Sequence, residues 1–219
     1  MEFWRYFRRP VILFRALGVP VRADMSWFLV VSIFAAASSA TAIEKVGSWA
    51  GSVAIGITAT LLFFASIFIH EFAHALAAKL EKLEVTEIVL HPFGGMTRFR
   101  HEPETPRAEF RIALAGPSAS FLLSVLFIGL MAAANAAQLD ILVLLMFLLA
   151  LSNFLLAVFN MFPGYPLDGG RVLRAYLWRS GRDMNEATLL TGRAGQVIAV
   201  GLALLGLGIV VFRSELFTG

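Results

Sequence analysis

Five long stretches without a charged residue or a histidine dominate this chain of 219 residues. They are residues 25–43, 46–69, 112–139, 141–167 and 194–212, and each has at least 19 residues. A helix needs about 20 apolar residues to cross the hydrocarbon core of a bilayer. The whole sequence is 58% hydrophobic and 15% charged, whereas a soluble domain is roughly 45–50% apolar and about 25% charged. We therefore expect an all-α polytopic membrane protein with about five transmembrane helices.

Basic residues are unevenly distributed among the segments that join these stretches. Membrane proteins concentrate Lys and Arg on the cytoplasmic side. With the N-terminus inside, residues 1–24, 79–111 and 171–193 are cytoplasmic and carry 5, 6 and 5 of the 18 Lys and Arg residues. This distribution predicts a multi-pass protein with a cytoplasmic N-terminus. Residues 1–24, basic and interrupted by prolines, are expected to lie at the membrane interface as a lead-in segment.

Three ionisable residues directly follow the second apolar stretch, in the sequence FIHEFAHALAAK. His70 and His74 are four residues apart, so they share one face of a helix. Two imidazoles at this spacing can bind one zinc ion, and the H-E-x-x-H pattern places Glu71 beside it as a general base. A helix that continues to Lys79 places His70 about 13 Å below the charged boundary, where ionisable groups are costly unless paired or coordinated. Metal binding is therefore favoured, with a buried polar network and a proton relay as the alternatives.

Asp168 is the candidate for a third metal ligand. It lies in NMFPGYPLDGGRVLRAYLWR, at the end of the fourth apolar stretch and on the same predicted side as the histidines. Catalytic zinc usually has three protein ligands and one open position, and the chain contains no cysteine. A helix N-cap and a salt bridge to Arg171 are the alternatives for Asp168. The residues expected to break any helix here are Pro163, Gly164, Pro166, Gly169 and Gly170.

The two motifs together resemble the site-2 protease family of intramembrane zinc metalloproteases. In that family H-E-x-x-H lies on a membrane helix, and a second motif reads approximately N-x-x-P-x-x-P-x-D-G-G-R, which residues 160–171 match at every fixed position. The resemblance implies that His70, His74 and Asp168 hold one zinc ion and that Glu71 activates the attacking water. It also implies that Asn160 binds substrate or stabilises the oxyanion. The alternative for Asn160 is an amide that packs between helices.

Residues 85–100, VTEIVLHPFGGMTRFR, have β-branched and aromatic residues around a proline and a Gly-Gly pair. This pattern is typical of two short strands and a turn, and the resemblance implies a small membrane-embedded β-hairpin. Its exposed edge, with Gly94, Gly95 and Met96, is expected to bind an unwound substrate segment by strand addition. An ordinary cytoplasmic hairpin is the alternative. The two remaining histidines, His91 and His101, are interpreted as turn or surface residues.

The resemblance covers nearly the whole chain and favours the compact branch without a PDZ insert. AGPSAS, residues 115–120, matches a further family signature, which we interpret as a packing kink at Pro117. Members of this branch commonly have a sixth segment and a pair of regulatory CBS domains. Neither is seen in these residues, so we expect one intramembrane metalloprotease domain over residues 1–219, either truncated or unusually short.

The function implied by the resemblance is zinc-dependent endoproteolysis in or near the membrane, on the cytoplasmic side. The expected partners are a single-span transmembrane substrate and the lipid bilayer of a prokaryotic cell membrane, with a cytoplasmic active-site opening and no nucleic acid. A zinc-binding transporter or metal sensor, which uses His70, His74 and Asp168 without hydrolysis, is the alternative. A third possibility is an inactive scaffold that holds client helices. Glu71 has no clear task in a transporter or sensor, and the intact H-E-x-x-H pattern argues against a scaffold.

Overall fold

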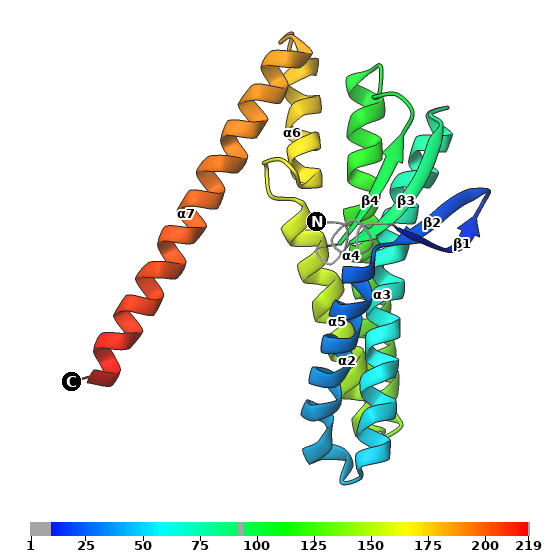
Figure 1. The fold of residues 1–219 in the computed structure, drawn as a ribbon, viewed down its shortest axis with the longest axis vertical. Coiled ribbons are helices and arrows are strands. Elements are labelled where there is room, and N and C mark those ends of the chain that lie inside the picture. Colours follow the sequence, from blue (N-terminus) through cyan, green and yellow to red (C-terminus); the bar gives the residue numbers. More distant parts are fainter. Residues whose placement is uncertain (1–9, 92–93, 219) are drawn as a thin grey trace, which may run out of the picture. The chain divides into compact units, whose positions relative to one another are not determined.

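The computed structural model describes residues 10–91 and 94–218. Contact density divides the chain into two compact units, the first Met1–Pro103 with Ala115–Val158 and the second Glu104–Leu114 with Phe159–Gly219. The elements shown in Figure 1 are, in chain order, β1 (Val11–Ala16), β2 (Val19–Ala23), α2 (Met25–Val46), α3 (Trp49–Leu80), β3 (Val85–His91), β4 (Gly94–Phe99), α4 (Pro106–Ala136), α5 (Asp140–Asn160), α6 (Asp168–Arg179) and α7 (Met184–Thr218).

Four helices in the described part of the chain are long and apolar enough to cross a bilayer. They are α3, α4, α5 and residues Met184–Val210 of α7, and the apolar part of α2 among these residues is Met25–Ala40. Large apolar side chains such as Leu61, Leu122 and Val197 are exposed on these helices, as expected where lipid surrounds a helix. The predicted polytopic helical class is confirmed, and four of the five expected spans meet the length criterion.

The helical hairpin of α2 and α3 is delimited by caps (blue and cyan in Figure 1). Ahead of α2, the carboxylate of Asp24 accepts a hydrogen bond from the Trp27 N–H at 2.9 Å. Gly47 ends α2 in the left-handed region at φ 68°, a conformation that costs glycine little. The Ser48 hydroxyl then caps α3 by accepting from the Gly51 N–H. Because only these two residues join the helices, α3 runs back along α2.

Asp24 also connects the start of α2 to the end of β3. Its carboxylate accepts a hydrogen bond from Ser26 Oγ at 2.5 Å and lies 3.0 Å from His91 Nδ1. Burial acts to raise the pKa of Asp24, but the hydrogen bonds from Ser26, His91 and the Trp27 N–H outweigh it, so the pKa lies below its ordinary value. His91 thus has a partner where the sheet meets the helix, while His101 is exposed.

The strands form one sheet in the order β1-β2-β3-β4. The pairs β1–β2 and β3–β4 are antiparallel, whereas β2 and β3 are parallel, so the α2–α3 hairpin is the connection between two neighbouring strands. The pairing of β3 with β4 confirms the hairpin expected within residues 85–100. The sheet is nevertheless larger than predicted. Residues 11–23, expected only as an interfacial lead-in, form the hairpin β1–β2.

The sequence of this N-terminal hairpin explains its structure. The buried residues of β2 alternate along the strand, as one face packs inward: Val19, Val21 and Ala23. Leu17 and Gly18 have positive φ angles of 48° and 83°, as a two-residue hairpin turn of type I′ requires. Strand β1 is exposed along most of its length, with Phe14 against Phe68 of α3 at a ring-centroid distance of 5.2 Å. The arginines and prolines within residues 1–24 make this alternation hard to recognise in the sequence, which favours an interfacial segment instead.

In the second unit, a buried ion pair joins α6 to the start of α4. Arg174 Nε donates to Glu109 Oε1 at 2.6 Å. Glu109 is 0% exposed and Arg174 only 7%. Removing one partner would leave the other charge buried, at a cost of about 3–5 kcal/mol. The pair therefore fixes how α6 packs against the first turn of α4.

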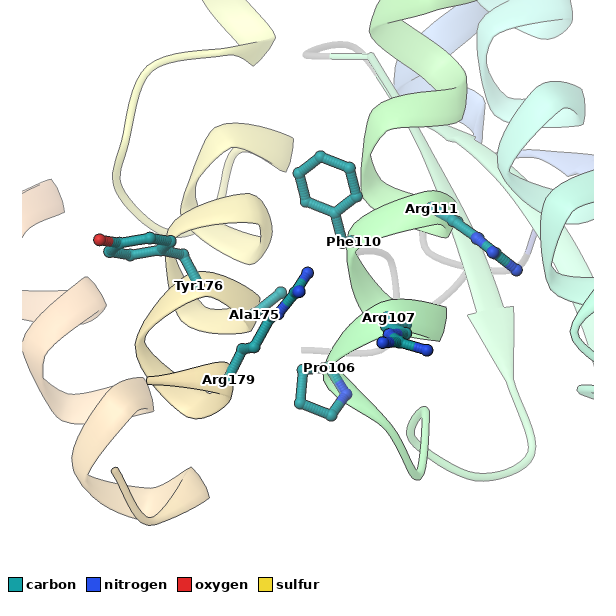
Figure 2. Close-up of a pocket in the computed structure, with 7 residues that line it drawn as sticks. All are labelled: Pro106, Arg107, Phe110, Arg111, Ala175, Tyr176 and Arg179. Atoms are coloured by element: carbon teal, nitrogen blue, oxygen red, sulfur yellow. The ribbon is translucent and has the colours of Figure 1, made fainter. Parts of the chain in front are cut away.

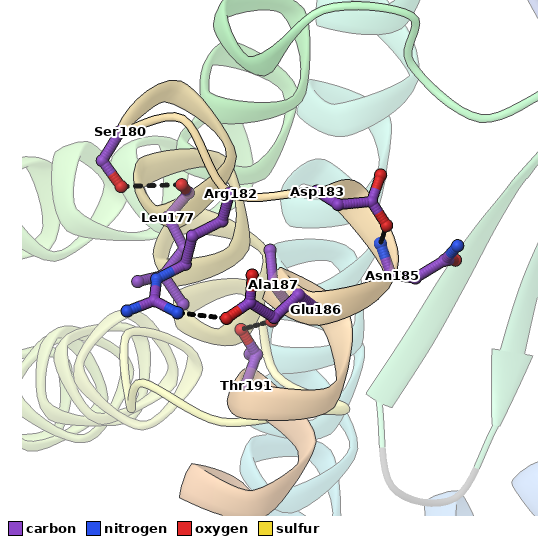
Figure 3. A network of polar contacts seen from close by, with 8 residues as sticks. All are labelled: Leu177, Ser180, Arg182, Asp183, Asn185, Glu186, Ala187 and Thr191. Atoms are coloured by element: carbon purple, nitrogen blue, oxygen red, sulfur yellow. Dashed lines mark hydrogen bonds and ion pairs between the residues drawn. The ribbon is translucent and has the colours of Figure 1, made fainter.

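The turn from α6 to α7 is closed by a small network of polar contacts (Figure 3). Arg182 forms an ion pair with Glu186, four residues later. Asp183 Oδ2 accepts a hydrogen bond from the Asn185 N–H at 3.2 Å, which supplies a partner for an amide at the start of α7. Because these groups are exposed, their contacts contribute little to the stability of the fold.

Candidate metal centre and active site

Helix α3 presents His70, Glu71 and His74 within little more than one turn. All three are buried, with exposed fractions of 3%, 6% and 3%. The Nε2 atoms of the two histidines are 3.3 Å apart. Two nitrogen ligands of a tetrahedral zinc ion, each about 2.05 Å from the metal, are also about 3.3 Å apart. The histidine pair therefore fits a zinc ion without any change in the helix.

Helix α4 supplies two residues that shape the surroundings of this pair. Ser120 Oγ lies 2.8 Å from His70 Nδ1. A proton on Nδ1, donated to Ser120, leaves the lone pair of Nε2 for a metal. One turn earlier, a Cβ on Gly116 would lie 2.2 Å from His74 Nε2 and 2.6 Å from His70 Nε2. Space beside both Nε2 atoms thus exists because residue 116 has no side chain.

Strand β4 contacts the carboxylate of Glu71. Thr97 Oγ1 lies 3.0 Å from Glu71 Oε2 and 3.0 Å from the Glu71 backbone oxygen, and its hydroxyl donates to them. A Cβ on Gly95 would lie 2.1 Å from Glu71 Cγ, so glycine allows the strand to approach this closely. The side chain of the predicted general base is therefore held between its own helix and the last strand of the sheet.

The predicted substrate-binding residues lie on the same strand. Gly94, Gly95 and Met96 pair on one side with β3, at His91, Leu90 and Val89. Strand β4 is the last in the sheet order, so within the described residues its other side carries no further strand. Met96 is 49% exposed. Such an edge has the geometry to which an extended segment can be added.

The remaining predicted residues belong to the second unit. Asn160 is the last residue of α5, and Asp168 is the first residue of α6; both are half-buried. The N-cap of α6 is Leu167, which makes no side-chain capping hydrogen bond, so the interpretation of Asp168 as an N-cap is wrong. That Asp168 and the two histidines bind the same metal ion stays a prediction.

The glycines after Asp168 do not break the helix, which corrects one expectation. Residues 161–167 form the irregular link from α5 to α6, but Gly169 and Gly170 are buried inside α6. Their role is steric. A Cβ on Gly169 would lie 2.3 Å from the Met161 backbone oxygen, and one on Gly170 would lie 2.6 Å from the Gly164 carbonyl carbon. Both glycines allow the first turn of α6 to pack against the preceding link.

Three supporting residues have no role at the site that the sequence predicts: Thr97, Gly116 and Ser120, the last two of which belong to the family signature in AGPSAS. They lie in HPFGGMTRF and AGPSAS, and the interpretation of the second segment as a packing kink alone is incomplete. The spacing of Gly116 and Ser120 by four residues signals that they share one helix face. Nothing in the spacing says that this face meets the histidines, because the contact depends on how α4 packs in the first unit.

Spanning helices and a buried histidine pair on one of them define an integral, multi-pass membrane protein with a metal-binding motif. The sequence model described as "Peptidase family M50" matches residues 58–136 and 128–205. The chain belongs to this family, that of the site-2 proteases, which confirms the resemblance seen in the two motifs.

Similar proteins carry the names of zinc metalloproteases. "Putative zinc metalloprotease Rip3" of Mycobacterium tuberculosis is 37% identical over 203 residues, covering 91% of this chain and 52% of that protein. "Zinc metalloprotease MJ0392" of Methanocaldococcus jannaschii is 29% identical over 198 residues, covering 89% and 53%. The solved "Site-2 Protease from Methanocaldococcus jannaschii" matches with a TM-score of 0.60 at 25% identity, covering 95% of this chain and 91% of that one. The chain spans about half the length of the curated relatives that it matches.

Proposed function

We propose that this chain is a zinc-dependent endopeptidase that cleaves a transmembrane substrate in or near the membrane, on the cytoplasmic side. The observation that carries the proposal is the histidine pair, with Nε2 atoms 3.3 Å apart, beside a glutamate contacted by an edge strand. A site that only stores or transports metal needs no general base beside its ligands, whereas peptide hydrolysis does. Family membership and the names of the relatives support the same activity.

One zinc ion per chain is proposed, with Nε2 of His70, Nε2 of His74 and the carboxylate of Asp168 as ligands. When bound, zinc lowers the pKa of water to about 7 and polarises a carbonyl group. The assignment of Asp168 is supported by the motif in residues 160–171 and by the family.

Glu71 takes the proton of the attacking water in this proposal and delivers it to the leaving amine. The Thr97 hydroxyl donates to Oε2, which would hold the carboxylate in position for this transfer. Asn160 is proposed to donate to bound substrate or to the developing oxyanion. Removing one such donor typically costs about 10²–10³ in rate.

The proposed substrate is a single-span membrane protein whose helix unwinds before cleavage. A peptide bond inside a helix is hydrogen-bonded internally, so the substrate must be extended before attack. The outer side of β4 at Gly94, Gly95 and Met96 offers backbone groups for strand addition. Thr97, on the same strand, contacts Glu71, so a segment added there would run past the base. The cytoplasmic placement is supported by the distribution of Lys and Arg.

The test compares wild type with Glu71→Gln after reconstitution in lipid vesicles with a candidate single-span substrate. We expect about one zinc ion per chain in both proteins and cleavage by the wild type alone. Cleavage by Glu71→Gln would contradict the proposed role of Glu71 as the general base. Zinc bound by the wild type without cleavage of any substrate tested would support the transporter or sensor instead. Asp168→Ala should weaken zinc binding, and an unchanged affinity would remove Asp168 from the ligand set.

A further inference from the structure

The second unit contains a pocket of about 330 Å³ between the first turns of α4 and the second half of α6 (Figure 2). Its volume is at the lower end of the range of about 300–1,000 Å³ for ligand sites. Three arginines and two aromatic residues are prominent in its lining: Arg107, Arg111, Arg179, Phe110 and Tyr176. None of these is a predicted metal ligand, base or substrate-binding residue, so the pocket is separate from the proposed catalytic chemistry.

The pocket has a positive charge that nearby acids do not neutralise. Arg179 extends from α6 into the space between the helices, and Arg107 lies at the first turn of α4 (Figure 2). In the part of the chain that the structure describes, neither guanidinium forms an ion pair. Glu109 is buried in its pair with Arg174. The guanidinium of Arg111 points away from α6, which leaves Arg107 and Arg179 to meet an anion.

The rest of the lining is apolar and lies at the end of a membrane span. Phe110 extends from α4 toward α6 and is 42% exposed, while Tyr176 is 68% exposed. Arg107 and Arg111 are the last basic residues before the uncharged residues 112–139 of a helix that can cross the bilayer. The pocket therefore lies at the level of the lipid headgroups, with the acyl region beginning about one turn further along α4.

We propose that this pocket binds the headgroup of an anionic phospholipid, with the phosphate at Arg107 and Arg179 and an acyl chain along Phe110. Guanidinium groups match phosphate oxygens in bidentate geometry, and basic pockets beside membrane helices bind anionic headgroups. A soluble anion can pair with the arginines but leaves the exposed ring of Phe110 uncovered. A zwitterionic lipid can cover the ring, but its ammonium group offsets the charge of its phosphate. The bound lipid would bridge α4 and α6, and α6 begins with Asp168.

The experiment uses the full chain, purified in a neutral detergent and titrated with dihexanoyl phosphatidylglycerol, with bound lipid counted by native mass spectrometry. Parallel titrations use dihexanoyl phosphatidylcholine, inorganic phosphate and a tetraglutamate peptide. We expect one phosphatidylglycerol site per chain, at least about tenfold tighter than the other three probes. Arg107→Gln and Arg179→Gln should each weaken it about fivefold, and the double variant about 25-fold.

Arg182→Gln is the matched control, because it removes an exposed arginine of the same unit that lies outside the pocket (Figure 3). Arg107 and Arg179 are also exposed, and exposed substitutions of this kind usually leave a fold intact; an unchanged circular dichroism spectrum checks this. Unchanged affinity in the double variant overturns the proposal, as does an equal loss in Arg182→Gln. Phosphate or tetraglutamate binding as tightly as phosphatidylglycerol would make the pocket a soluble-anion site. Equal affinity for phosphatidylcholine would overturn the proposal as well, because the pocket would then not select for a negatively charged headgroup.

Discussion

Gly116→Ala is the substitution that most directly probes the space beside the histidine pair. The added Cβ would lie 2.2 Å from His74 Nε2 and 2.6 Å from His70 Nε2, while real Cβ atoms essentially never come within 3.0 Å of such neighbours. To restore that separation, the two nitrogens must retreat by about 0.8 Å and about 0.4 Å. Metal–ligand distances tolerate only about 0.2 Å. We therefore expect zinc affinity to fall by about 100-fold, the upper end of the range for disturbing a ligand's support.

The measurement is competition between the purified protein in detergent and a chromophoric zinc chelator, together with the metal content of the protein. Gly129→Ala is the control, since it adds the same methyl group to the same helix where nothing lies within 4 Å of the new Cβ. Alanine is favoured over glycine inside a helix by about 1 kcal/mol, so this variant should keep its zinc and its stability. Wild-type zinc affinity in Gly116→Ala would refute the argument, and so would equal zinc loss from both variants.

Two further predictions concern the sheet. Thr97→Val should lower kcat/KM about tenfold with zinc content unchanged, because it removes a hydrogen bond to the charged Glu71 carboxylate. Thr97→Ser keeps the hydroxyl and should retain activity. The control Thr86→Val loses only a hydrogen bond to the Arg98 backbone oxygen and should leave kcat/KM unchanged. An equal loss of activity in Thr86→Val would contradict the role of Thr97 in positioning Glu71. Asp24→Ala should lower the stability at pH 7 by about 1 kcal/mol, measured by thermal unfolding in detergent. Since the folded-state pKa of Asp24 is depressed, its contribution is present above the ordinary pKa of about 3.9 and is lost as the pH falls through the folded value. The difference from wild type should therefore shrink toward pH 3, and a difference that grows would contradict this account.

The membrane helices and the histidine motif are predictable because their signals are local. An uncharged stretch of sufficient length is a property of consecutive residues, and the i, i+4 spacing fixes a helix face without any tertiary information. Helix α3 was expected to continue as far as Lys79, and the structure ends it at Leu80. The prolines Pro163 and Pro166 were expected to break any helix, and the structure ends α5 before them, at Asn160.

The supporting contacts of the site are not local, which is why the sequence does not reveal them. Ser120 lies 50 residues from His70, and Thr97 lies 26 residues from Glu71. Each contact requires one element to pack on another in a particular register, and the composition of either segment leaves that register open. The expectation that Gly169 breaks a helix was wrong for the same reason. Gly169 lies inside α6, and it must be glycine because the Met161 backbone packs against it.

The N-terminal strands were missed for a different reason. The alternation in β2 is only five residues long, and an arginine and a proline occupy the outward positions. A pattern this short is outweighed by the basic, aromatic composition around it, which equally suits a segment at a membrane surface. The strand pairs with β1 in a hairpin and with β3 in parallel, and the second partner, more than 60 residues away, leaves no trace in the local sequence.

That parallel pairing also determines how many times the chain between the two strands crosses the bilayer. Strands β2 and β3 are neighbours in one sheet, so the chain leaves and re-enters the sheet on the same face of the membrane. The number of crossings between them must be even. Because α3 is long enough to cross, α2, which contains the uncharged residues 25–43, must make the other crossing. Reporters placed just before β1 and just after α3 should therefore always lie in the same compartment, whichever compartment it is.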